Sequence, residues 1–238
     1  EPLAEIYQNK GASECALGVG ATDEECAFAQ VLEPCQPGET AGCAFQTGFV
    51  RQGMKVGLEL ERELGFNPLQ NGVIAATDNH NANPGAVEEW NHRGSVGTIS
   101  SPAVRRLSGR GRGDKPYQSL LKFNTSGGLA AVWAPENTRE AIFDALARRE
   151  TYATSGPRIA LRFYAGWDLD EAMIDPPGLV QHLEATAVPM GAVFSTRQQT
   201  QSPGFLIWAI RDPLDAPLQR IQMVKGWIDD AGQTHEKV

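Results

Sequence analysis

The stretch Gly72-Val73-Ile74-Ala75-Ala76-Thr77-Asp78-Asn79-His80 decides the fold class that the sequence predicts. It opens with an apolar run of strand length, and the amides and the Pro-Gly pair of segment 81–85 cannot extend a strand. Because side chains alternate along a strand, a strand that continues to His80 would present Asp78 and His80 on one face. An apolar strand that ends in polar side chains is typical of α/β enzymes, whose chemistry lies at the carboxyl ends of strands.

Asp78 and His80 are candidate metal ligands, since a carboxylate is a hard oxygen ligand and an imidazole a borderline nitrogen ligand. The alternative is that the D-x-H tripeptide only forms a turn after the strand. Zinc takes three or four ligands and harder cations take more. The remaining histidines, which offer no second metal-ligand spacing, are His92, His182 and His235. The sequence therefore predicts part of a metal site.

Composition limits the classes of function. The chain has 238 residues, 41% apolar and 21% charged, which suits a globular protein of one large domain or one domain plus a smaller one. Its formal net charge of −8 argues against a nucleic-acid partner. No apolar stretch has the length of a membrane span. The chain starts without methionine inside a strand-like segment, so we expect it to be part of a longer polypeptide that continues upstream.

The cysteines all fall in segment 11–48, which is rich in Gly, Glu and Pro and is predicted to be a long loop. Their spacing does not match the short C-x-x-C pairs of structural zinc sites. Two disulfides of open pairing are favoured over reduced thiols that pack as small hydrophobes. Disulfides would imply an oxidising compartment, so we expect a periplasmic or secreted protein. The four positions are Cys15, Cys26, Cys35 and Cys43.

The hydrophobic pattern divides the chain into two parts. In the first, strands are predicted over 3–8, 71–77 and 128–133, a helix over 49–64 that ends at Gly65, and a helix that opens with Asn137 as N-cap and runs to about Arg149. From Pro157 onward, strand-like segments at 158–163, 205–210 and 218–227 are broken by Pro and Gly, and no further helix is evident. The predicted fold class is α/β plus β, with domains 1–156 and 157–238.

Several strings, spread over nearly the whole chain, are specific when taken together. The strings are Glu5-Ile6-Tyr7-Gln8-Asn9-Lys10-Gly11 with Ser13-Glu14-Cys15; Thr77-Asp78-Asn79-His80 with Pro84-Gly85-Ala86-Val87-Glu88-Glu89; Gly127-Gly128-Leu129-Ala130-Ala131-Val132-Trp133-Ala134 with Glu136-Asn137-Thr138-Arg139-Glu140-Ala141; Arg149-Glu150-Thr151-Tyr152-Ala153-Thr154-Ser155-Gly156-Pro157-Arg158; and Gln222-Met223-Val224-Lys225-Gly226-Trp227.

Together, these strings resemble an uncharacterised bacterial family, the domain of unknown function 3604 (DUF3604). That family in turn resembles the polymerase and histidinol phosphatase (PHP) superfamily of metal-dependent phosphoesterases. The resemblance implies that 1–156 is the C-terminal part of a distorted (β/α) barrel with a cysteine-containing insertion at 11–48, and that 157–238 is an all-β unit. Asp78 and His80 match the late D-x-H metal motif, and the cofactor would be a divalent Mn, Zn or Fe. The early H-x-H motif is not in this chain, so the remaining ligands would lie upstream and this portion alone is not expected to be active.

For the intact protein, the resemblance implies hydrolysis of a phosphate ester, a small anionic substrate. Lys10 and Glu5 would lie near the barrel mouth, where Lys10 would meet the anion and Glu5 would orient substrate or water. The structural alternative for both is a salt bridge or a solvated loop. Residues that would line the pocket, or instead satisfy their own loop backbone, are Asn79, Asn81, Trp90 and His92.

Two other hypotheses stay open at this point. The β-rich part could be a non-catalytic binding or structural module of a larger secreted protein, with the D-x-H as a turn and a surface formed by Trp167, Trp208 and Trp227. Alternatively, the barrel could be present without activity.

Overall fold

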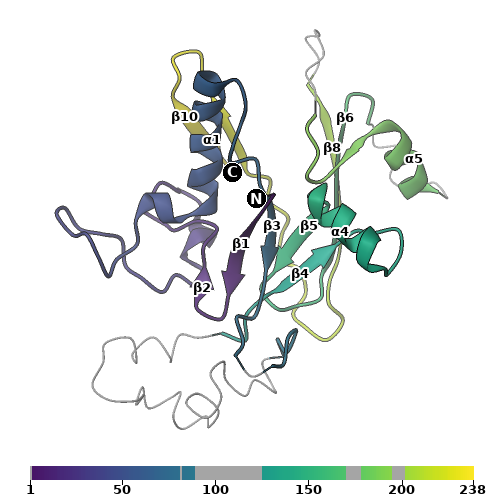
Figure 1. The fold of residues 1–238 in the computed structure, drawn as a ribbon, viewed down its shortest axis with the longest axis horizontal. Helices are drawn as coiled ribbons and strands as arrows, with labels where there is room; N and C mark the ends of the chain where they lie inside the picture. Colours follow the sequence, from purple (N-terminus) through teal and green to yellow (C-terminus); the bar gives the residue numbers. More distant parts are fainter. Residues whose placement is uncertain (1, 81, 89–124, 170–177, 195–201) are drawn as a thin grey trace.

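The computed structural model describes residues 2–80, 82–88, 125–169, 178–194 and 202–238. The fold is mixed α/β with several small sheets (Figure 1), and within these residues the strands do not close into a barrel. None of the described helices is long and apolar enough to cross a membrane. The strands are β1 (Leu3–Gln8), β2 (Gly11–Ala12), β3 (Gly72–Ala75), β4 (Leu129–Val132), β5 (Thr151–Thr154), β6 (Ala160–Gly166), β7 (Val188–Pro189), β8 (Gly204–Ile210), β9 (Lys225–Ile228) and β10 (Thr234–Lys237); the α-helices are α1 (Val50–Leu64), α4 (Arg139–Ala147) and α5 (Leu179–Thr186).

The central feature is the parallel pairing of β1 with β3, in which Leu3 lies opposite Gly72 and Glu5 opposite Ile74. β2 pairs with β1 on its other side. β5 lies alongside β3, where the Thr151 hydroxyl donates to the carbonyl of Val73 at 3.0 Å. β4 starts beside the end of β3 and is antiparallel to β5. β1, β3 and β5 therefore end at one common edge.

Helix α1 forms the crossover between β1 and β3. It ends, as predicted, at Gly65, which has φ 79° and donates its N–H to the carbonyl of Glu61. The helix contacts the β9–β10 hairpin, which returns from the C-terminal end of the chain (Figure 1). Three apolar side chains of α1 line a mainly apolar cavity of about 490 Å³ together with Ile6 and Val73; they are Val50, Met54 and Leu58.

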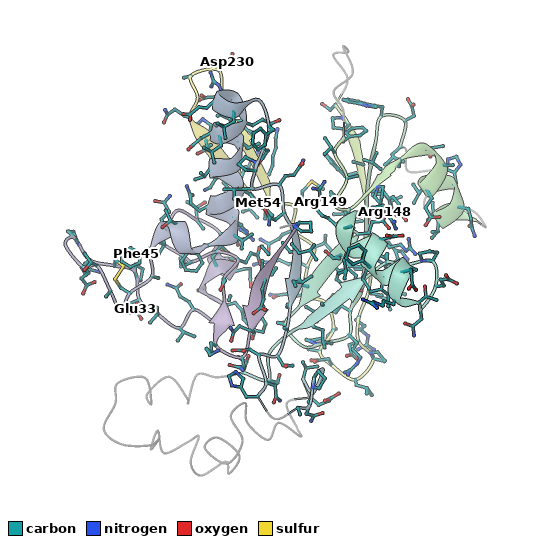
Figure 2. All side chains as sticks on the ribbon, viewed as in Figure 1. Glu33, Phe45, Met54, Arg148, Arg149 and Asp230 are labelled. Carbon is teal, nitrogen blue, oxygen red and sulfur yellow. A yellow bond between two sulfur atoms is a disulfide. The ribbon has the colours of Figure 1, made fainter. Side chains whose placement is uncertain are left out.

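The segment between β1 and α1 is a long loop held by two disulfides, as expected from the sequence. The structure pairs Cys15 with Cys26 and Cys35 with Cys43. A disulfide is visible in Figure 2 beside Glu33 and Phe45. Apart from β2, the loop contains only two short 3₁₀ turns, Glu24–Ala27 and Gln46–Gly48. Because the loop has so little regular structure, its covalent bridges carry much of its order.

A cluster of buried and half-buried charges joins this loop to α1 and to the C-terminal hairpin. The Arg51 guanidinium donates to Glu14 Oε1 at 2.6 Å and to Asp23 Oδ2 at 2.9 Å. Lys55 donates to the carbonyl of Gly20 at 3.0 Å. Glu236 of β10 lies 3.6 Å from Lys55 and 3.8 Å from Arg51. Three segments that are distant in sequence thus share one network.

Three predictions about local structure are wrong. The segment from Pro157 onward is not all-β, because α5 lies within it. The N-cap of α4 is Thr138, whose hydroxyl accepts from the N–H of Ala141 at 3.3 Å, and not Asn137. The strand expected over 218–227 is limited to β9, since its earlier residues pair with no described strand.

Arg149 connects the two parts of the chain. It follows α4 in the left-handed conformation, with φ 63°, so the helix ends before this residue and not at it. The Arg149 side chain donates to the carbonyl of Gly191 at 2.9 Å and to that of Gln70 at 3.2 Å. Figure 2 shows Arg149 between β3 and the later strands. The Arg149 side chain therefore joins the residues before β3 to the residues after β7 by hydrogen bonds.

We predict that acid weakens the charge cluster through Asp23. Burial raises the pKa of Asp23, but hydrogen bonds from Arg51 and from the Glu25 N–H outweigh this effect and lower it below 3.8. A carboxyl with a lowered folded-state pKa contributes stability that is complete above 3.8 and is lost as pH falls through the folded value. Asp23→Asn should lower the free energy of unfolding at pH 7 by about 1.5–3 kcal/mol. It should also flatten the acid limb of stability against pH, measured by urea unfolding from pH 7 to pH 3; parallel acid limbs would contradict this.

Candidate functional site

The carboxyl ends of β1 and β3 bring together residues that are distant in sequence. Asn9 and Lys10 follow β1, and Asp78 and His80 follow β3. The sequence predicts that strand alternation places Asp78 and His80 on one face. This prediction is wrong, because β3 ends at Ala75. Instead the chain turns: Asp78 adopts φ 49°, and the N–H of Asn79 donates to the Thr77 hydroxyl at 3.2 Å. The chain therefore bends at the D-x-H, and in this bend, here called the turn after β3, the two side chains converge.

The Asp78 carboxylate lies between an imidazole and an ammonium group. His80 Nε2 is 3.2 Å from Asp78 Oδ1. Lys10 Nζ contacts Asp78 Oδ2 and lies 3.3 Å from Gln8 Oε1. The side chains of Lys10 and His80 are 59% and 58% exposed and that of Asp78 is 29% exposed, so the group is open to solvent and to small ligands.

The distance between Asp78 Oδ1 and His80 Nε2 suits a direct hydrogen bond and is also the separation of two neighbouring ligands of one cation. Ligand atoms that bind one metal at about 2.0–2.2 Å are separated by roughly 3 Å, close to the observed distance between Oδ1 and Nε2. Within the described ranges, however, no group of three or more His, Cys, Asp or Glu side chains could hold a metal ion. Further ligands would have to come from outside the described part of the chain.

A glycine pair forms the wall of the site. The backbone approaching β4 crosses the ends of β1 and β3, where the N–H of Thr125 donates to the carbonyl of Asn9 at 2.9 Å and that of Gly128 to Ala76 at 2.8 Å. Gly127 has φ 90°, and a Cβ placed there would lie 2.6 Å from the Cα of Thr77. Only glycine fits this close approach of two backbones.

An ion pair lies next to this wall. Gly156 follows β5, and a Cβ placed on it would lie 3.6 Å from Val87, which is buried. The neighbouring residues Glu88 and Arg158 form an ion pair at 3.1 Å. The pKa of Glu88 is lowered by its own backbone N–H and by Arg158. In the sequence, Glu88 stands only within one of the strings that carry the family resemblance, and its partner Arg158 lies too far along the chain to be inferred.

Sequence reasoning missed Asn9, which is 2% exposed. Its side-chain amide donates to the carbonyls of Thr77 at 2.7 Å and Asp78 at 2.9 Å. Its position directly after a strand was the available signal, because polar residues at strand ends are common at functional edges.

Not every predicted residue lies beside the pair. Glu5 is exposed in the middle of β1 opposite Ile74, and is not at the edge where Lys10 lies. Asn79 is half-buried within the turn. The positions that fall outside the described residues are Asn81, Trp90 and His92.

The three tryptophans proposed for a binding surface do not form a row. Trp208 lies on β8 opposite Arg162, whereas Trp167 follows the far end of β6 and stacks on Phe194. Trp227 belongs to the separate β9–β10 hairpin, where it stacks on His235. The arrangement gives no support to a shared tryptophan surface.

We predict that Gly127→Ala disturbs the wall of the site. The added methyl group would meet the Thr77 backbone and strain a positive φ, so the free energy of unfolding should fall by about 2 kcal/mol or more. Gly85→Ala is the matched control, because Gly85 has φ 75° but no atom within 4 Å of the added Cβ; it should cost about 1 kcal/mol. Equal losses of the two variants in urea unfolding would show that the contact with Thr77 has no cost.

Comparison with known proteins gives a family and no function. No curated protein and no solved structure matches the chain significantly. The model of one family, described as a protein of unknown function (DUF3604), matches residues 1–238. With the whole chain matched, this protein belongs to the DUF3604 family.

Proposed function

We propose that this chain contributes Asp78 and His80 as two ligands of a divalent cation in a hydrolase that acts on phosphate esters. The observation that carries the proposal is the convergence of Asp78 Oδ1 and His80 Nε2 to 3.2 Å, with the Lys10 ammonium on the other carboxylate oxygen. The group lies at the edge where parallel strands end, the usual place of chemistry in α/β enzymes.

The donor types agree with the resemblance to the PHP superfamily. A carboxylate and an imidazole together suit Mn, Zn or Fe, and their spacing matches the D-x-H motif of those phosphoesterases. The chemistry that such a cation supplies when bound is activation of a water molecule and neutralisation of charge on the phosphoryl oxygens. His80 uses Nε2 toward Asp78, which leaves Nδ1 to be oriented by a hydrogen-bond acceptor.

Lys10 binds the substrate anion in this proposal. Its ammonium group is close to the proposed ligands yet largely exposed, so it can reach a phosphoryl oxygen without desolvation of a buried charge. The ion pair that it makes with Asp78 is solvent-exposed and therefore weak, so an anion can compete for the ammonium group.

The compartment proposed from the cysteines is extracytoplasmic. The described cysteines all form disulfides, and such bridges persist in the periplasm or outside the cell. Substrates would accordingly be phosphate esters available in that compartment.

The metal proposal is tested by elemental analysis of the intact protein purified without added metal. Asp78→Asn with His80→Gln should lose the Mn, Zn or Fe that the wild type retains. The matched control is Asp229→Asn with His235→Gln, which removes another Asp–His contact, 2.7 Å long, on the β9–β10 hairpin. The control should keep its metal. Equal metal content in all three proteins, or none in the wild type, would reject the ligand assignment.

A second prediction concerns Lys10 and the substrate. Lys10→Met should raise the KM for a small phosphate ester such as p-nitrophenyl phosphate about tenfold, because one charge-assisted hydrogen bond to the anion is lost. It should weaken inhibition by inorganic phosphate by a similar factor. Lys225→Met, on β9, is the control and should change neither. Metal binding with no hydrolysis of any phosphate ester would favour a barrel without this activity.

A further inference from the structure

We infer that Asn9 is the positioning residue that holds Asp78 in the conformation in which its carboxylate meets His80. The inference rests on the proposed function, since it names the residue on which the ligand pair depends. Asn9 directly follows β1, whereas the pair belongs to the turn after β3. A residue next to β1 thus restrains the turn that carries the ligand pair after β3.

The contacts of Asn9 are directed at the turn. Its side-chain Nδ2 donates to the carbonyl of Thr77 at 2.7 Å and to that of Asp78 at 2.9 Å. Its backbone N–H also donates to the Thr77 carbonyl, at 3.3 Å. Two carbonyl groups can only accept, so the amide nitrogen must face them and the orientation of the side chain is determined. Asn9 therefore clamps two successive peptide groups.

These two peptide groups flank Asp78, which has a left-handed backbone conformation. Asp78 adopts φ 49°, a conformation that L-residues other than glycine rarely occupy and that Asp tolerates better than most. A turn of this kind persists when surrounding contacts determine it. The clamp on both sides of Asp78 supplies that restraint and so fixes the direction in which its carboxylate leaves the backbone.

Asn9 is almost fully buried, and its side-chain amide nitrogen points to the turn after β3. Its Oδ1 has no hydrogen-bond partner among the described residues, although the atom is buried. A buried acceptor without a partner is unfavourable. Among the described residues, the side-chain hydrogen bonds of Asn9 are therefore the two that Nδ2 donates to the turn, while Oδ1 accepts none. At 2% exposure, Asn9 does not itself reach solvent or ligand.

The test compares metal affinity with fold stability in one series of variants. Asn9→Leu removes both donor contacts at similar size, and Asn9→Ser keeps a shorter donor if the leucine variant does not fold. Tyr7→Phe is the matched control: it removes the hydroxyl contact to Thr125 Oγ1, 3.1 Å long, from a buried residue of the same strand. With the variants made in the intact protein, titration calorimetry with Zn²⁺ or Mn²⁺ gives the affinity, and thermal unfolding without metal gives the stability.

Asn9→Leu should weaken metal affinity by about 10–100-fold, the usual effect of losing a residue that orients a ligand, with a smaller loss in Asn9→Ser. Tyr7→Phe should lower the unfolding temperature while leaving metal affinity within about twofold. Affinity equal to wild type in both Asn9 variants would overturn the positioning role.

Asp78→Asn separates the two proposals. If Asp78→Asn binds the metal as well as the wild type, the ligand assignment itself fails. If it loses the metal while the Asn9 variants retain wild-type affinity, the positioning role alone fails.

Discussion

The parallel pairing of β1 with β3 is the constraint on which the rest of the structure depends. Parallel neighbours cannot be joined by a tight hairpin, so the chain must leave the edge, cross one face of the sheet and return. Here the crossover contains the disulfide-bridged loop and α1. The register places the end of β1 against the turn after β3, and this brings Asn9 and Lys10 to Asp78 across the whole crossover. The candidate site exists only because these two strands end together.

Such a long crossover with little regular structure carries a conformational entropy cost. Two kinds of contact offset it. The disulfides shorten the loop covalently. The network around Arg51 then joins the loop to α1 and β10 through ion pairs and a hydrogen bond from Lys55 to a backbone carbonyl. Since breaking one member of such a network leaves others uncompensated, the loop, helix and hairpin form one cooperative unit.

The elements predicted best from the sequence are those whose signals are local. β1, α1 with Gly65, and the disulfides follow from apolar periodicity, a C-cap glycine and clustered cysteines. α5 was missed because it is short and begins at Gly178 without a side-chain cap. The Asp78–His80 pair was identified, yet the reason for its convergence was not, because a positive φ at Asp78 is not visible in an alternation pattern. Asn9 and Gly127 both contact the backbone of Thr77, which is distant from them in sequence. A local sequence pattern does not reveal such contacts.

The two oxygens of Asp78 divide the roles of the site. Oδ1 faces the imidazole of His80 and Oδ2 faces the ammonium of Lys10, so a ligand pair and an anion-binding group would share one carboxylate. Exposed ion pairs contribute little stability and exchange readily, so neither contact can define the site by itself. The contacts of Asn9 with the Thr77 and Asp78 carbonyls are buried and part-buried, so in our proposal they hold the site while the exposed partners exchange. In such a site, hydrogen bonds to the backbone would maintain the geometry. The exposed side chains could then exchange an internal partner for an incoming ligand.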